Sequence, residues 1–121
     1  MAQAATLNQQ QLARALSAAT NSRYPVRNRA ILLVQHLSGM RVGEVAALLY
    51  GDVVATDGTI RAEVRLSAAQ TKGNKSRTVL LPERLRAELA YFTAQHASKV
   101  NTKPLFAEAV HQFLLQCHLV L

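Results

Sequence analysis

The chain has 121 residues, of which 50% are hydrophobic and 17% are charged. These values fit a single folded domain with one core and exclude a disordered chain. The 14 Lys and Arg residues exceed the 7 Asp and Glu residues, and the resulting net charge of +7 favours a polyanionic partner such as nucleic acid. One cysteine excludes an internal disulfide, and no secretory signal or membrane-spanning stretch is present. We therefore expect a reduced, cytoplasmic protein without a membrane partner.

Hydrophobic residues recur at helical spacing in the first fifty residues. The spacing predicts helices over about 8–19, 25–38 and 42–49, with Asn8 or Thr6 as a cap for the first. The helix over 25–38 is apolar around most of its circumference, so we expect it to be the central buried helix. Gly39 is placed to end this helix in the left-handed conformation.

The hydrophobic period changes to two after the turn signal Asp57-Gly58. Alternation over 59–66 predicts a half-buried strand, and Gly73-Asn74 between 67–72 and 75–81 predicts a tight hairpin. A fourth helix is expected over 83–98, with His96 on its apolar face, and an apolar helical tail follows from 105. The expected fold is one α+β domain, predominantly helical, with a small three-stranded antiparallel sheet.

Positive charge is concentrated in the middle of the chain. The net charge is +2 over residues 1–60, +6 over 61–103 and −1 over 104–121. We expect the middle segment to form most of the surface that faces a polyanion.

The run LSGMRVGE places Arg41 at the start of a helix, immediately after a glycine turn. Backbone N–H groups at such a position attract anions, and a guanidinium can hold a phosphate through two parallel hydrogen bonds. Glu44 falls on the same helix face and could orient Arg41 or its surroundings. The alternative is an ordinary surface ion pair between Arg41 and Glu44, worth a few tenths of a kcal/mol.

A second cationic cluster surrounds the predicted turn, in the run TKGNKSR. Lys72, Lys75 and Arg77 would project from the domain, where they could reach into a groove, and a lysine could protonate an oxygen leaving group. The alternative is a solvated turn whose lysines prevent aggregation at the sheet edge.

Together these segments resemble a known family. The run RNRAILLVQHLSGMRVGEVAALLYGDV, followed by TKGNKSRTVLLP and a leucine-periodic helix, is similar to the catalytic domain of tyrosine recombinases, the phage integrase family, over residues 6–106. The resemblance implies part of that domain's fold and a role in DNA recombination and integration. It implies that Arg41 holds the scissile phosphate, that Lys72 protonates the departing 5′ oxygen, and that Glu44 supports the site. The reaction that it implies needs no metal or other cofactor.

The chain also departs from the family pattern. Three residues after His111, Leu114 stands where the family has its second arginine. Residues 107–121 form a divergent apolar tail, and no late tyrosine is present. Tyr24, Tyr50 and Tyr91 correspond to parts of the family fold that do not carry the nucleophile. The resemblance therefore implies a truncated, catalytically incomplete domain, inactive by itself.

The resulting hypothesis is a DNA-binding fragment of a site-specific recombinase. Arg41, Lys72, Lys75 and Arg77 would contact duplex DNA, with backbone contacts added by Arg61 or Arg65. One alternative is a non-catalytic module that pairs through its apolar tail, with itself or with an intact recombinase that it regulates. Another is a degenerate product without a selected function. His111 and His118 alone make a poor metal site, and Cys117 is expected to be a buried hydrophobe.

Overall fold

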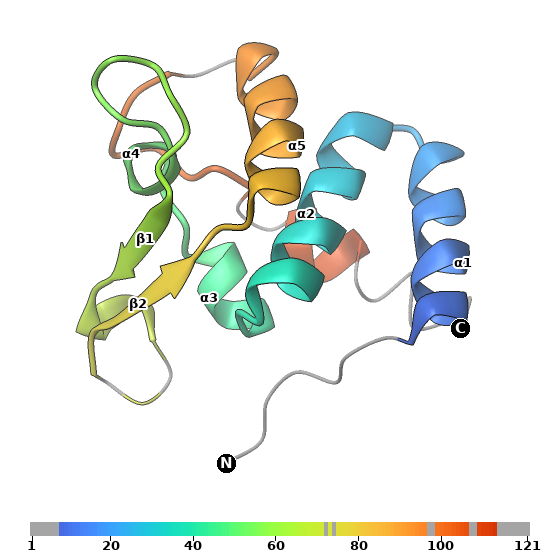
Figure 1. The fold of residues 1–121 in the computed structure, drawn as a ribbon, viewed down its shortest axis with the longest axis horizontal. Coiled ribbons are helices and arrows are strands. Elements are labelled where there is room, and N and C mark those ends of the chain that lie inside the picture. The colour runs from blue at the N-terminus through green and yellow to red at the C-terminus, as the bar shows by residue number, and fades with distance from the viewer. Residues whose placement is uncertain (1–7, 72, 74, 97–98, 107–108, 114–121) are drawn as a thin grey trace.

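The computed structural model describes residues 8–71, 73, 75–96, 99–106 and 109–113. Helices and strands occur in the order expected of an α+β chain, with helices before and after a small sheet (Figure 1). The elements are α1 (Gln9–Thr20), α2 (Pro25–Ser38), α3 (Val42–Ala46), α4 (Tyr50–Val53), β1 (Glu63–Leu66), the short 3₁₀ helix η1 (Ala68–Gln70), β2 (Arg77–Leu80) and α5 (Glu83–Ala94). Residues 109–113 are also helical.

Helix α2 is the centre of the molecule, as its sequence predicts. It packs against α1 on one side and α5 on the other (Figure 1). All residues from Ala30 to Val34 are buried, because α2 has neighbours around most of its circumference. Gly39 ends the helix with a φ of 76°, which glycine adopts without a steric cost. The Asn8 side chain caps α1 by accepting a hydrogen bond from the Gln11 N–H at 2.8 Å.

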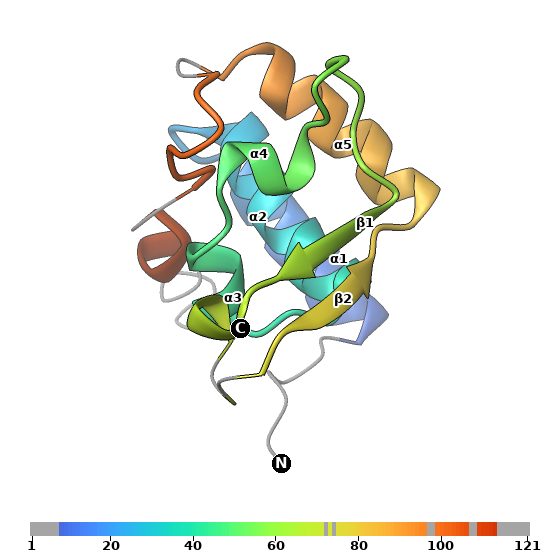
Figure 2. The same cartoon turned by 90° about the vertical axis from the view of Figure 1, so that its left-hand side faces the viewer.

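The sheet has two strands among the described residues, so the prediction of three strands is wrong. β1 pairs antiparallel with β2, Glu63 opposite Leu80 and Leu66 opposite Arg77, and the two strands cross in front of α2 in Figure 2. Ile60 forms only a single bridge to Val54. Alternation of apolar residues therefore extends further along the chain than the strand itself.

β1 and β2 form the predicted hairpin, but the connection between them is longer than the tight turn that the sequence predicts. β1 ends at Leu66 and β2 begins at Arg77, and η1 lies between them; Lys72 and Asn74 lie outside the described residues. The Gln70 side chain accepts a hydrogen bond from the Ser67 N–H at 2.9 Å. Such a local side-chain bond competes with strand pairing, which explains why 67–70 turns instead of extending.

The helix predicted over 42–49 is shorter than expected, and a separate short helix follows it. α3 ends at Ala46, and α4 begins at Tyr50. Between them the backbone bonds to a distant segment, because Leu105 N–H donates to the Leu48 carbonyl at 2.9 Å and Tyr50 N–H donates to the Lys103 carbonyl at 2.9 Å. These long-range hydrogen bonds replace those of a continuous helix.

Helix α5 ends at Ala94, earlier than predicted, so His96 lies beyond it; Ala97 and Ser98 lie outside the described residues. His96 Nε2 is 3.0 Å from the Leu105 carbonyl oxygen, and its ring packs against Tyr50 and Phe92. The histidine is therefore partly buried with a polar partner, as expected of a residue at the edge of the core.

The first part of the apolar tail belongs to the same core. Leu105, Phe106, Val110 and Phe113 are all buried. Leu114, Cys117, His118 and the rest of the tail lie outside the described residues. Within the described part of the chain, no helix is both long and apolar enough to cross a membrane.

Candidate functional site

The turn after α2 places Arg41 immediately before α3. The Ser38 hydroxyl caps the end of α2 by donating to the Val34 carbonyl, and it accepts the Met40 N–H at 3.2 Å. Met40 is fully buried and anchors the turn in the core. Arg41 is therefore presented at the start of α3 from a backbone that is held on both sides, with its side chain only partly buried.

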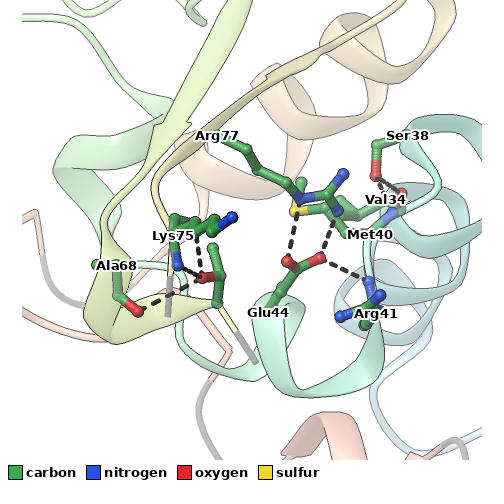
Figure 3. A network of polar contacts seen from close by, with 9 residues as sticks. Val34, Ser38, Met40, Arg41, Glu44, Ala68, Lys75 and Arg77 are labelled. Atoms are coloured by element: carbon green, nitrogen blue, oxygen red, sulfur yellow. Dashed lines mark hydrogen bonds and ion pairs between the residues drawn. The ribbon is translucent and has the colours of Figure 1, made fainter. Parts of the chain in front are cut away.

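Glu44 is the structural centre of the site. Its side chain is only 2% exposed, and it accepts the Arg41 backbone N–H at 3.0 Å. Arg77 reaches across from β2 and donates two hydrogen bonds to the carboxylate, Nε at 3.1 Å and Nη2 at 2.5 Å (Figure 3). This bidentate pair joins the first residue of β2 to α3, so two segments of the predicted site meet at one buried carboxylate.

The alternative of an ordinary surface ion pair between Arg41 and Glu44 is wrong. Glu44 is buried, and the cation that it holds is Arg77. Burial alone would raise the pKa of Glu44, and it is the largest single influence on this carboxyl group. The hydrogen bonds from Arg77 and the Arg41 N–H, together with their positive charges, outweigh burial and hold the pKa of Glu44 below its ordinary value of 4.5.

The loop between β1 and β2 carries the second cationic cluster. Lys75 is exposed, and its backbone is bound to Thr71: the Thr71 hydroxyl donates to the Lys75 carbonyl at 2.7 Å and accepts the Lys75 N–H at 3.1 Å. Figure 3 shows Lys75 beside the Glu44–Arg77 pair, on the opposite side from Arg41 in that view. Lys72 lies outside the described residues, so its position relative to Arg41 stays a prediction.

Arg61 and Arg65 lie on the β1 side of the molecule. Arg65 is exposed within β1, and Arg61 Nε donates to the Gly51 carbonyl at 3.1 Å. Both line a groove that also contains Asp52 and Glu63. The charge of this groove is therefore mixed.

The three tyrosines have different surroundings. Tyr24 is 47% exposed at the start of α2 and stacks under Arg27, whose guanidinium carbon is 4.3 Å from the ring centroid. The 14 residues of α2 separate Tyr24 from the turn before Arg41, which corresponds to about 21 Å along the helix axis. Tyr50 is 7% exposed, and Tyr91 is 60% exposed on α5.

A comparison with protein families matches residues 5–115 to the phage integrase family, over nearly the whole chain. The chain belongs to the phage integrase family. No curated protein and no solved structure matches it. Membership gives this integrase chain a function related to site-specific recombination, as the resemblance of its motifs implies.

The sequence pattern missed two contacts of the candidate site. It grouped Arg77 with the exposed cations, but nothing in the spacing showed that Arg77 pairs with Glu44, 33 residues earlier. It also missed Gln70, which the pattern placed in a strand. No group of three or more His, Cys, Asp or Glu side chains able to hold a metal occurs in the described residues.

Proposed function

We propose that this integrase chain binds duplex DNA through the surface around the start of α3 and the loop after β1. Arg41 grips a backbone phosphate of the strand to be exchanged. Lys72 acts at the tip of the loop, where the family's lysine protonates the departing 5′ oxygen. Lys75 and Arg77 add contacts to neighbouring phosphates, and Arg61 or Arg65 extends them.

One observation supports this proposal above the others. Among the described residues, Arg77 contacts one carboxylate, that of Glu44. This carboxylate is 2% exposed, so it binds the arginine on its buried side and presents little negative charge to solvent. The Arg77 side chain remains 44% exposed, although its Nε and Nη2 donate hydrogen bonds to Glu44. A phosphate approaching Arg41 would therefore meet positive charge from α3, from β2 and from Lys75.

We further propose that the 121-residue polypeptide does not cut DNA by itself. In the family, a second arginine and a late tyrosine complete the active site, and this sequence has Leu114 at the expected arginine position. Electrostatic stabilisation of the transferring phosphate is among the largest contributions to the rate of such reactions, so losing it lowers the rate severely. The chemistry that remains is phosphate binding.

The alternative is a non-catalytic module that pairs through its apolar tail. Val110 and Phe113 of the tail's helix are buried in the chain's own core and Ala109 packs against it, so these residues are not free to pair with another chain, which favours the DNA-binding proposal. The two functions differ in their response to salt. Phosphate contacts weaken steeply as salt rises, whereas an apolar interface is nearly insensitive or strengthened.

The test is fluorescence anisotropy of a labelled duplex over a series of salt concentrations. Phosphate contacts by Arg41, Lys72, Lys75 and Arg77 predict a slope of log K against log salt of about −3.6, and a further contact by Arg61 or Arg65 steepens it by about 0.9. Arg41→Ala should make the slope less steep by about 0.9, because one contact is lost. Arg14→Ala is the matched control, since Arg14 is exposed on α1, on the far side of α2 from the sheet (Figure 1). Equal effects of the two substitutions, or binding that is insensitive to salt, would overturn the proposal.

A further inference from the structure

The side chain of Gln70 satisfies its entire hydrogen-bonding capacity where the β1–β2 loop begins. Its Oε1 accepts from the Ser67 N–H at 2.9 Å and from the Ser67 hydroxyl at 3.1 Å. Its Nε2 donates to the Ala47 carbonyl at 2.9 Å and to Asp52 Oδ2 at 2.7 Å. An amide side chain has two acceptor and two donor positions, so all four are used. Gln70 thereby fastens the loop to the junction between α3 and α4.

Asp52 connects Gln70 to the start of α4. Asp52 Oδ2, which accepts the hydrogen bond from Gln70 Nε2, also accepts one from the Leu49 N–H at 2.9 Å and so caps the start of α4. A carboxylate shared between a helix start and a loop amide makes strong, charge-assisted hydrogen bonds. The position of the loop is therefore set by the helical segment that directly follows α3.

The other end of the loop is held to α3 itself. Arg77, the first residue of β2, bonds to Glu44, which also accepts the Arg41 N–H. Inside the loop, the Thr71 hydroxyl bridges to both backbone groups of Lys75. Both ends of the segment that contains Lys72 are thus attached to the helices that follow Arg41.

We propose that Gln70 is a positioning residue for DNA binding, which holds the base of the loop so that its cations lie within reach of the phosphate bound by Arg41. The inference rests on the function proposed above. Its physical basis is entropic. A loop already held at both ends loses less freedom when its lysines contact DNA, so more of the interaction energy appears as affinity.

The test combines Gln70→Ala with removal of the loop cations. In the otherwise unchanged chain, Gln70→Ala should weaken duplex binding about three- to tenfold, the cost of ordering one or two long side chains. In a chain that carries Lys72→Ala and Lys75→Ala, the same substitution should change affinity less than about twofold, because no loop cation is left to position. A general loss of structure would weaken binding equally in both backgrounds, and that result would overturn the proposal. All measurements are made at a temperature where thermal melting shows each variant folded.

A second measurement does not depend on DNA. Trypsin cleaves after lysine, so the rate of native-state cleavage at Lys72 and Lys75 reports how firmly the loop is held. Gln70→Ala should raise this rate about three- to tenfold, whereas Gln10→Ala, an exposed glutamine on α1, should leave it unchanged. If the chain fails to bind duplex DNA, the proposed function is wrong but faster cleavage still supports the loop anchor. An unchanged cleavage rate overturns the anchor whatever the DNA result.

Discussion

The pair formed by Glu44 and Arg77 shows how one residue contact sets the geometry of the candidate site. Removing a carboxylate from water is costly, and Glu44 is 2% exposed. Three hydrogen bonds compensate, two from the Arg77 guanidinium and one from the Arg41 N–H. Arg77 keeps 44% of its side chain exposed, so the pair avoids the full desolvation of a completely buried salt bridge. The contact therefore contributes more to the position of β2 relative to α3 than to the free energy of folding.

Arg77→Ala should destabilise the fold at neutral pH by about 1–3 kcal/mol, less than the loss for a fully buried pair because Arg77 is half-exposed. Glu44 has a lowered pKa in the folded protein, so the pair's stabilisation is present above pH 4.5 and is lost as the pH falls through the folded pKa. Without Arg77, burial raises the pKa of Glu44, and the carboxyl group takes up a proton more readily. The destabilisation should therefore shrink between pH 7 and about pH 4.

Urea unfolding at the two pH values measures this change without adding salt. Arg14→Ala, which removes an exposed arginine from α1, serves as the control and should have a small effect at both pH values. A loss of stability from Arg77→Ala that is the same at pH 7 and pH 4 would contradict the assigned role of Glu44.

Arg41→Lys separates charge from geometry at the proposed phosphate site. Lysine keeps the positive charge but cannot form the two parallel hydrogen bonds of a guanidinium. Duplex affinity should fall about three- to tenfold while the dependence on salt keeps its slope, because the number of phosphate contacts is unchanged. Anisotropy titrations at several salt concentrations measure both quantities. A less steep slope, like that expected for Arg41→Ala, would show that lysine does not reach the phosphate.

At the scale of elements, the short helix α4 depends on a distant segment. Gly51 N–H donates to the Asn101 carbonyl at 3.0 Å, and the neighbouring Tyr50 N–H is held by Lys103. A Cβ atom at Gly51 would lie 2.8 Å from Asn101 Cβ and 3.1 Å from the Asn101 carbonyl oxygen. Glycine is therefore required here by close approach of two backbone segments, and not by an unusual φ.

Gly51→Ala should destabilise the chain by about 1–3 kcal/mol, since the added methyl group must push the Asn101 segment away from α4. Gly43→Ala is a matched control. Gly43 lies in α3 with no atom within 4 Å of its would-be Cβ, so alanine should be neutral there or stabilise by up to about 1 kcal/mol. Thermal or urea unfolding of the two variants provides the comparison, and equal stabilities would contradict the packing of 101–105 against α4.

At the scale of the whole molecule, the two exposed tyrosines lie on elements other than α3 and β2, which carry Glu44 and Arg77 of the proposed DNA surface. Tyr24 lies at the end of α2 far from Arg41, and Tyr91 lies on α5. A nucleophile must approach the phosphate to within about 3–3.5 Å and in line with the leaving oxygen. Tyr50 is 7% exposed and packs against His96, so it is also poorly placed to attack.

We therefore predict that the chain forms no covalent adduct with a nicked suicide duplex. Loss of a single electrostatic contact to the transferring phosphate costs about 3–4 kcal/mol, a factor of 10²–10³ in rate, and this sequence has Leu114 where the family pattern has its second arginine. A denaturing gel after incubation would reveal an adduct. An adduct that disappears when Tyr24, Tyr50 or Tyr91 is changed to phenylalanine would refute the prediction.

Local chemistry in the sequence determined much of this protein. Pro25 and Gly39 bound α2 as predicted, because a fixed φ favours a helix start and a left-handed glycine favours its end. The run from Ala30 to Val34 identified the buried centre, and the order of the LSGMRVGE and TKGNKSR runs identified the family. Each of these signals depends on neighbouring residues or on the order of motifs.

Only the tertiary structure decided the features that depend on residues far apart in the chain. The helix predicted over 42–49 ends at Ala46, and the Leu48 carbonyl beyond it bonds to Leu105. The run 67–72, predicted as a strand, contains η1, whose Gln70 bonds to Asp52. Glu44 is buried under Arg77 for the same kind of reason, since its partner comes from another element. Spacing along the sequence describes one element at a time, whereas the free energy of burying a polar group depends on whatever partner the fold brings to it.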